Sequence, residues 1–135
     1  MLTPHSIDMK SLCLSLLISL CTFFVYGQNT KKDLEKFRTG KFTYLGQEED
    51  VVIIRTKKQQ TETYNQGKSK LILKIEWVND STYVLTHQKA IEAPGCLTKG
   101  DWIKTIITSQ DGNKYTCTYT SNKCGSGEGT IVKLE

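Results

Sequence analysis

The stretch KLILKIEWVNDSTYVLTHQKA, residues 70–90, decides the fold. Apolar residues recur at every second position of its first arm, the period of a half-buried strand; they are Leu71, Leu73, Ile75 and Trp77. Asn79-Asp80-Ser81 supplies turn chemistry, and Tyr83 and Leu85 share one face of the second arm. We predict a β-hairpin in which Trp77 opposes Tyr83 across a three- or five-residue loop. A two-residue Asn-Asp turn would bury one aromatic ring instead of two.

Strand patterns on both sides of this hairpin indicate seven or eight strands. We predict strands at 40–45, 51–58, 101–108, 113–120 and 130–134, with 59–64 either continuing its predecessor or forming a strand of its own. Breaker-rich segments predict loops at 65–69, 92–100 and 121–129. No segment is long enough for a crossover helix, so we expect an antiparallel meander. Closure or near closure into a small barrel would remove its exposed edges, with a short helical turn within Thr30–Phe37 in front of it.

Residues 1–27 have the pattern of a secretory signal peptide. Lys10 precedes an apolar run, residues 11–25, and Gly27 is a small residue suited to the cleavage site. A run of about fifteen residues is short for a membrane-spanning helix, which needs roughly 20. We predict cleavage before Gln28, and therefore no membrane span in the mature chain and a secreted or periplasmic location.

Alternatives at the N-terminus stay open. Translation starts at Met1 or at Met9, which directly precedes the basic residue of the leader. An uncleaved anchor and a lipoprotein attached at Cys21 are the rivals of the cleaved form. In each case residues 28–135 are expected to form a single domain.

Charge and motifs exclude several function classes. The net charge is +4, but acidic and basic residues are interspersed, which is typical of a solvated surface. A nucleic-acid-binding chain would show a basic stripe with aromatic residues ready to stack, so we expect no nucleic-acid partner. The sequence has no metalloprotease, esterase or paired catalytic motif. Glu62 and Glu76 are a conceivable acid–base pair, but Glu76 falls on a polar strand face. We therefore expect no enzyme activity, no catalytic residue and no cofactor.

Cysteine and histidine are too few for a metal site. After cleavage the chain has Cys96, Cys117, Cys124 and one histidine, His87. A zinc site needs about four clustered ligands, so we expect no metal and interpret His87 as a strand residue at the end of the hairpin. An exported domain meets oxidising conditions, which favour one disulfide and one free thiol.

The register of the sixth and seventh predicted strands selects the disulfide pair. A tight turn that places Gln110 opposite Asn113 brings Cys124 to the end of the sheet where Cys96 lies in a loop. Cys117 then lies in mid-strand, roughly 20 Å of extended chain from Cys124. We predict a Cys96–Cys124 bond with Cys117 buried and free. The rival pair, Cys117 with Cys124, requires the chain after the strand to fold back sharply.

A barrel of about eight strands is just wide enough to hold one small ligand. We choose as candidate ligand-binding residues Arg55, Tyr44, Tyr64, Trp77, Tyr83 and Tyr119. If Arg55 faces a cavity, Arg55→Leu is expected to abolish binding of an anionic ligand and preserve the fold. We expect a non-catalytic binding module for a small apolar or amphipathic ligand. The alternative is an envelope-associated or extracellular interaction or structural domain, in which the aromatic residues simply fill the core.

Two families share parts of this pattern. Phe37-x-x-Gly40-Lys41-Phe42 after a helical turn resembles the start of lipocalins and other calycins, with Phe42 in place of their tryptophan. Residues 37–135 more closely resemble small exported Bacteroidetes proteins that often carry the label "DNA topoisomerase IV". The shared motifs are Phe37–Tyr44, Ile53–Thr56, Gln60–Glu62 and the tryptophan hairpin. These resemblances imply a lipocalin-like barrel. The topoisomerase label implies no activity, since that machinery needs a much larger chain.

Overall fold

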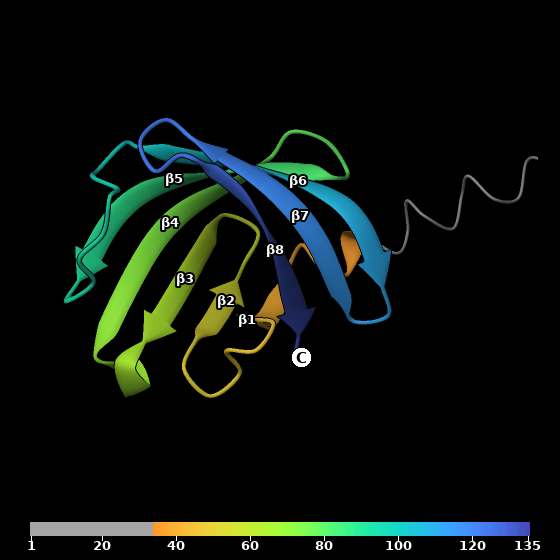
Figure 1. Ribbon diagram of the computed structural model, residues 1–135, viewed down its shortest axis with the longest axis horizontal. Coiled ribbons are helices and arrows are strands. Elements are labelled where there is room, and N and C mark those ends of the chain that lie inside the picture. Colours follow the sequence, from red (N-terminus) through yellow and green to blue (C-terminus); the bar gives the residue numbers. More distant parts are fainter. Residues whose placement is uncertain (1–33) are drawn as a thin grey trace, which may run out of the picture. The chain divides into compact units, whose positions relative to one another are not determined.

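The computed structural model describes residues 34–135, which form a closed barrel of eight antiparallel strands (Figure 1). The strands are β1 (Gly40–Tyr44), β2 (Val52–Arg55), β3 (Gln59–Tyr64), β4 (Ser69–Trp77), β5 (Thr82–Ile91), β6 (Trp102–Asp111), β7 (Lys114–Ser121) and β8 (Ser126–Lys133). Each strand pairs with the next, and β1 pairs with β8 to close the ring. The predicted all-β meander and its closure are confirmed. The predicted signal peptide lies outside the described residues.

The hairpin formed by β4 and β5 has the predicted odd loop. Trp77 pairs with Tyr83, so five residues separate them. The interior face is also as predicted, because Leu73, Ile75 and Tyr83 are almost completely buried. A bulge between Ile72 and Leu73 shifts the register further along the hairpin. His87 is a strand residue as predicted, but it lies inside β5 and is buried instead of marking the end of the hairpin.

The hairpin of β6 and β7 has a different register from the predicted one. Gln110 pairs with Tyr115, not with Asn113, and Asp111 pairs with Lys114. The two-residue loop therefore begins at Gly112, whose φ of 57° suits the left-handed backbone that such loops require. A second bulge beyond Ile107 then places Ile107 opposite Cys117.

Two other strand boundaries also differ from the sequence-based ones. The run 51–58 is not one strand, because β2 ends at Arg55 and a turn closed by Thr56 N–H and Gln59 O (2.8 Å) reverses the chain. Residues 59–64 are therefore a separate strand. The glycine-rich segment 121–129 is mostly not a loop, since β8 begins at Ser126. A Cβ at Gly127 would lie 2.6 Å from Tyr119 Oη, so glycine at 127 makes room for a tyrosine ring.

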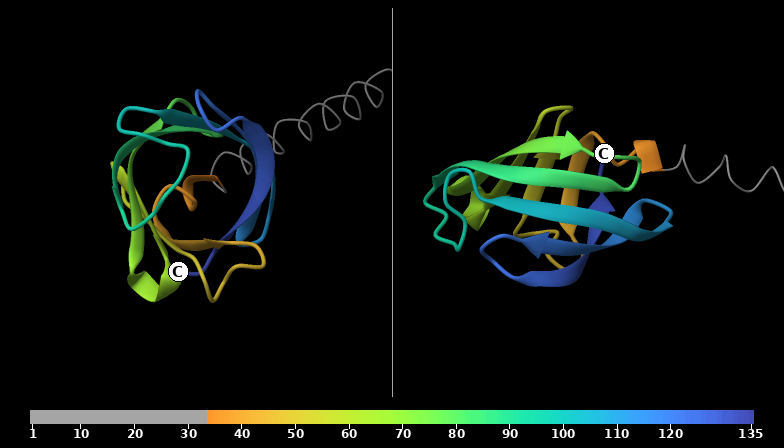
Figure 2. Two further views of the ribbon diagram at one scale, coloured as in Figure 1. Left: turned by 60° about the vertical axis from the view of Figure 1, so that its left-hand side comes forward. Right: turned by 90° about the horizontal axis from the view of Figure 1, so that it is seen from above.

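One end of the barrel is closed by the segment before β1. A helical turn at Leu34–Arg38 lies within the ring of strands in the left view of Figure 2. Its Phe37 is fully buried and meets the Tyr115 ring edge-on, with 4.9 Å between ring centroids. Lys133 Nζ on β8 donates to Lys36 O at 2.6 Å. Gly40 continues the chain at φ 129°, and a Cβ there would lie 2.4 Å from Glu135 O.

Phe37 belongs to the hydrophobic core of the barrel. Its largest apolar members are Phe37, Phe42, Ile53, Leu73, Ile75, Tyr83 and Tyr115. The right view of Figure 2 places the helical turn at one end and the loop between β5 and β6 at the other. Apolar side chains therefore close the end with the helical turn, whereas loops surround the end with the β5–β6 loop, which we call the open end.

Candidate functional site

A line of polar side chains runs along the inside of β2 and β3. Arg55 pairs with Gln60 across the two strands, and Glu62 follows Gln60 on the same face. All three are buried, with exposed fractions of 2%, 1% and 4%. A strand alternates its faces, so the same alternation that buries these side chains points Thr61 and Thr63 outward. The interior of the barrel thus contains one cation and one anion in a mostly apolar setting.

The protein itself satisfies the Arg55 guanidinium. Nε donates to Gln60 Oε1 at 2.9 Å, and Nη1 donates to the Phe37 carbonyl at 2.8 Å. Nη2 donates to Tyr115 Oη at 3.1 Å and to Tyr83 Oη at 3.4 Å. The guanidinium also lies 4.8 Å from the ring centroid of Tyr83. Since every guanidinium nitrogen has an acceptor, Arg55 fastens the helical turn to the barrel.

Glu62 is the centre of a second group of hydrogen bonds. Gln60 Nε2 donates to Glu62 Oε1 at 2.8 Å, so the Gln60 amide connects Arg55 with Glu62. Tyr44 Oη lies 3.1 Å from both carboxylate oxygens, and the Tyr64 hydroxyl donates to Oε2. In every one of these hydrogen bonds Glu62 is the acceptor, which suits an ionised carboxylate because that group can only accept.

The tyrosines around these charges stay protonated. Burial, followed by the charge of Glu62, raises the pKa of Tyr44 well above its ordinary value. The same two causes raise the pKa of Tyr64. Burial also raises the pKa of Tyr115, in spite of the nearby Arg55. The phenols therefore act as neutral hydroxyl groups, and the interior charges are those of Arg55 and Glu62.

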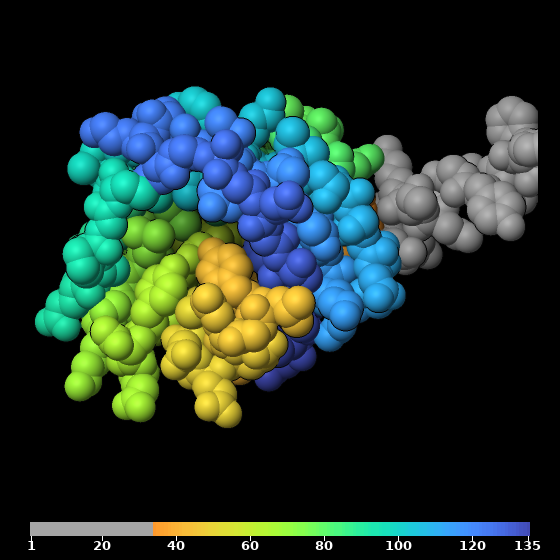
Figure 3. All heavy atoms as spheres, in the orientation of Figure 1, coloured from red at the N-terminus to blue at the C-terminus, as the bar shows by residue number. Residues whose placement is uncertain are grey.

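A cavity of about 560 Å³ lies beside Glu62 inside the barrel. Its polar wall carries the β1 and β3 side chains Tyr44, Gln60, Glu62 and Tyr64. Its apolar wall is formed by Leu71, Leu73, Leu85, Ile103, Cys117 and Ile131. Figure 3 shows the surface hollowed between the green strands β3 and β4 and the blue strands β7 and β8. The strands β1 and β2 have only five and four residues, so the barrel wall is shortest where these two strands form it.

A smaller pocket of about 400 Å³ adjoins the cavity under the loop between β5 and β6. Tyr64 and Leu71 line both spaces. The remaining wall is the loop segment 92–97 together with Asn65 and Ser69. The two spaces are therefore separated by a thin partition at the open end of the barrel.

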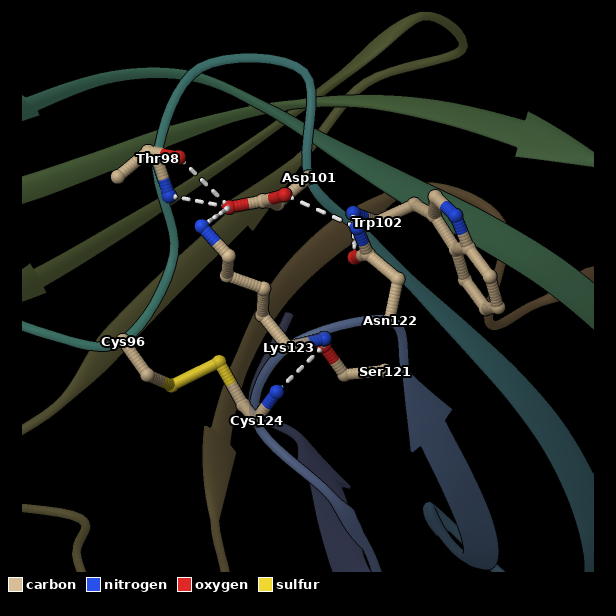
Figure 4. The surroundings of a disulfide bond; sticks show 8 residues. All are labelled: Cys96, Thr98, Asp101, Trp102, Ser121, Asn122, Lys123 and Cys124. Carbon is tan, nitrogen blue, oxygen red and sulfur yellow. Dashed lines mark hydrogen bonds and ion pairs between the residues drawn. A yellow bond between two sulfur atoms is a disulfide. The ribbon is translucent and has the colours of Figure 1, made fainter.

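The predicted Cys96–Cys124 disulfide connects the two loops beside this pocket (Figure 4). Its Cα atoms are 5.7 Å apart, within the usual range, and Cys117 is free and buried as predicted. Asp101 reinforces the same connection, because it accepts from Thr98 N at 2.7 Å and from Asn122 Nδ2 at 2.9 Å. The Thr98 backbone bond, then the Thr98 hydroxyl and the Asn122 amide, hold the pKa of Asp101 at about 2.

Four of the six candidate ligand-binding residues line the cavity. Tyr83 is buried, Tyr44 and Tyr64 are half-buried, and Tyr119 has 37% of its surface exposed. Arg55 faces the interior but lies outside the cavity lining, and its donors are engaged by the protein. The geometry therefore does not support the expected role of Arg55 toward an anionic ligand.

Trp77 is the other candidate that lies away from the cavity. Its ring packs against Tyr83 at 4.8 Å between centroids, and the Arg38 guanidinium lies over the Trp77 ring, 4.9 Å from its centroid. It faces an outer groove at the closed end of the barrel. Its role in this structure is to cover the core.

Glu62 lines the cavity but was not among the candidate ligand-binding residues chosen from the sequence. The Gln60-x-Glu62-x-Tyr64 alternation was the available signal, but β3 is polar on both faces, so the pattern alone does not tell which face is inside. Glu76, its conceivable catalytic partner, lies on the exposed face of β4 and pairs with Lys74 at 2.8 Å. The structure does not bring these two carboxylates together. Among residues 34–135, no three acidic, cysteine or histidine side chains gather as metal ligands.

Comparison of the chain with models of protein families, with curated proteins and with solved structures finds no match. Its function is therefore argued from the geometry of the barrel.

Proposed function

We propose that this chain is an exported, non-catalytic binding protein that holds one small apolar or amphipathic molecule inside its barrel. The observation that carries the proposal is the cavity of about 560 Å³ with its adjoining pocket. Binding sites for small molecules typically measure roughly 300–1,000 Å³ and combine apolar walls with a few convergent polar groups. The leucine and isoleucine side chains that line the cavity together with Glu62 and its tyrosines give it this composition.

Export is supported by the disulfide and by the leader. Disulfides form and persist in oxidising compartments, and Cys96–Cys124 is well placed in this fold. No helix among residues 34–135 is long and apolar enough to cross a membrane. The predicted signal peptide and the resemblance to small exported Bacteroidetes proteins support the same secreted or periplasmic location.

The alternative function, an interaction or structural domain, requires a filled interior. The cavity argues against it. The exposed large apolar side chains are also distributed over many elements, including Leu45, Ile54, Val78, Trp102 and Ile106. A protein-binding face would gather them into one patch.

Mass spectrometry of the natively purified protein tests the proposal. We expect an additional small molecule that is released on denaturation. Leu85→Trp would fill the cavity from its apolar wall and should remove that mass, whereas Ile54→Trp on the outer face should retain it. A chain that carries no such mass and binds no member of a panel of apolar probes would refute the proposed function.

A further inference from the structure

The cavity carries charge of one sign. Among the residues that line it, the only acidic or basic side chains are Glu62 and Glu128. Glu62 lies deep in the wall and is 4% exposed, whereas Glu128 is exposed at the edge. No lysine, arginine or histidine belongs to this lining. A ligand that enters the cavity therefore meets negative charge, although the chain as a whole has a net charge of +4.

The buried cation Arg55 is not part of the cavity lining. Arg55 lies behind Gln60 and Tyr83, which line the cavity and accept its hydrogen bonds. Gln60 turns its amide nitrogen toward Glu62. A head group at the polar wall thus reaches the Glu62 carboxylate and the tyrosine oxygens, whereas the guanidinium lies behind the lining residues Gln60 and Tyr83.

The hydrogen-bonding groups near Glu62 suit a donor. The hydroxyl hydrogens of Tyr44 and Tyr64 are directed to the carboxylate, which leaves the phenolic oxygens with free lone pairs. An alkylammonium has three donors and no acceptor, so it complements this arrangement. The rings of Tyr44 and Tyr64 also line the cavity, and aromatic faces attract cations. A carboxylate ligand would instead meet like charge and no free cation.

We propose that the bound molecule is an amphipathic organic amine. Its ammonium group contacts Glu62 between Tyr44 and Tyr64, and its apolar part lies along the Leu71 wall toward the pocket under the β5–β6 loop. This inference rests on the proposed binding function and specifies the ligand class of that same cavity. It replaces the anionic ligand that the sequence suggested for Arg55.

Three ten-carbon probes that differ only in the head group test the inference: decylamine, 1-decanol and decanoate. Calorimetric titration at pH 7 and low salt compares them, since the amine is protonated there as a lysine side chain is. We expect decylamine to bind at least about tenfold more tightly than decanoate, a difference of about 1.4 kcal/mol, with decanol between them. Non-specific attraction to a chain of net charge +4 would favour decanoate, so an amine preference must come from the cavity.

Two variants locate the head group. Glu62→Gln should weaken decylamine binding about tenfold or more and leave decanol binding within about twofold. Glu128→Gln at the edge is the matched control and should change decylamine binding much less. If Glu62→Gln does not fold by circular dichroism, Tyr64→Phe takes its place, because it removes one phenolic oxygen from the proposed site. An affinity for decylamine that neither Glu62→Gln nor Tyr64→Phe changes would overturn this placement.

The probe series also separates the two proposals. Decanoate binding as tightly as decylamine, or more tightly, would overturn the amine inference and leave the binding function intact. If none of the three probes binds, both the inference and the proposed function are wrong.

Discussion

Replacing Arg55 with methionine should destabilise the barrel severely. Methionine keeps an unbranched apolar stem and removes every donor of the guanidinium. Tyr83 and Tyr115 still have each other, because their hydroxyl oxygens are 2.9 Å apart. Phe37 O and Gln60 Oε1 lose the donors that satisfy them at 2.8 and 2.9 Å. The change therefore leaves two buried acceptors without these partners.

The expected loss follows from these two acceptors. Each buried polar group left unsatisfied costs about 1–3 kcal/mol, so the two together cost roughly 2–6 kcal/mol. We expect Arg55→Met to lower the free energy of unfolding by about 4 kcal/mol. Since a domain of this size has roughly 5–15 kcal/mol in total, the variant should be barely folded.

Urea unfolding of the wild type and variants, with the disulfide intact, measures this loss. Ile54→Met on the outer face of the same strand is the matched control and should change stability by no more than about 0.5 kcal/mol. Arg55→Lys keeps the positive charge but loses the planar guanidinium, so its loss of stability should lie between those of Ile54→Met and Arg55→Met. A loss below about 1 kcal/mol for Arg55→Met would refute the claim that Arg55 fastens the helical turn to the barrel.

A double-mutant cycle tests whether Arg55 and Glu62 act together through Gln60. In the wild type, Glu62→Gln removes a satisfied carboxylate. In the Arg55→Met background the Glu62 carboxylate has already lost the interior cation. The change Glu62→Gln should therefore lower the free energy of unfolding less in that background than in the wild type. We expect a coupling of at least about 0.5 kcal/mol. Additive losses would show that the two groups are independent.

The other predictions concern the open end, the free thiol and the leader. Replacing Cys96 and Cys124 with serine should lower the free energy of unfolding by about 3.5 kcal/mol, the chain-entropy value for a sequence separation of 28. Urea unfolding measures this loss, and a value below about 1 kcal/mol would contradict the prediction. Cys117 is 4% exposed, and burial raises the pKa of its thiol to about 11. Iodoacetamide at pH 8 should therefore label Cys117 only after unfolding. Rapid labelling of the folded protein would contradict this prediction, because it would show that the thiol is accessible. Because the pKa of Asp101 is about 2 in the fold and 3.8 ordinarily, its stabilising effect should be complete above about pH 4 and disappear as the pH falls through 2. Asp101→Asn should weaken this acid dependence of unfolding, and an unchanged pH profile would contradict the assignment. N-terminal sequencing of exported material should begin at Gln28; a chain that starts at Met1 would refute cleavage.

The fold could be predicted from the sequence because the alternation of apolar and polar residues along a strand is a local pattern. The alternation in Leu71–Trp77 predicted the interior face of β4, and the parity of Trp77 and Tyr83 predicted the odd loop. Short turns excluded crossover helices and so predicted the meander. The Cys96–Cys124 pair was also predicted correctly, although through a register that was wrong at Gln110. The pairing was correct because it depended on which end of the sheet each cysteine occupies, and a shift of two positions does not change that.

Tertiary structure decided which side chains reach the cavity. From the sequence, Arg55 is one of several basic residues in the run 51–58. Nothing local shows that the Phe37 carbonyl and two tyrosines from β5 and β7 would accept hydrogen bonds from it. Glu62 is likewise one polar residue in a strand that is polar on both faces. Its significance comes from Tyr44 on a different strand and from the space that the short strands β1 and β2 leave open. Alternation along one strand is a local property that the sequence determines, whereas the contacts of a buried charge are made between strands far apart in the chain and exist only after the barrel closes.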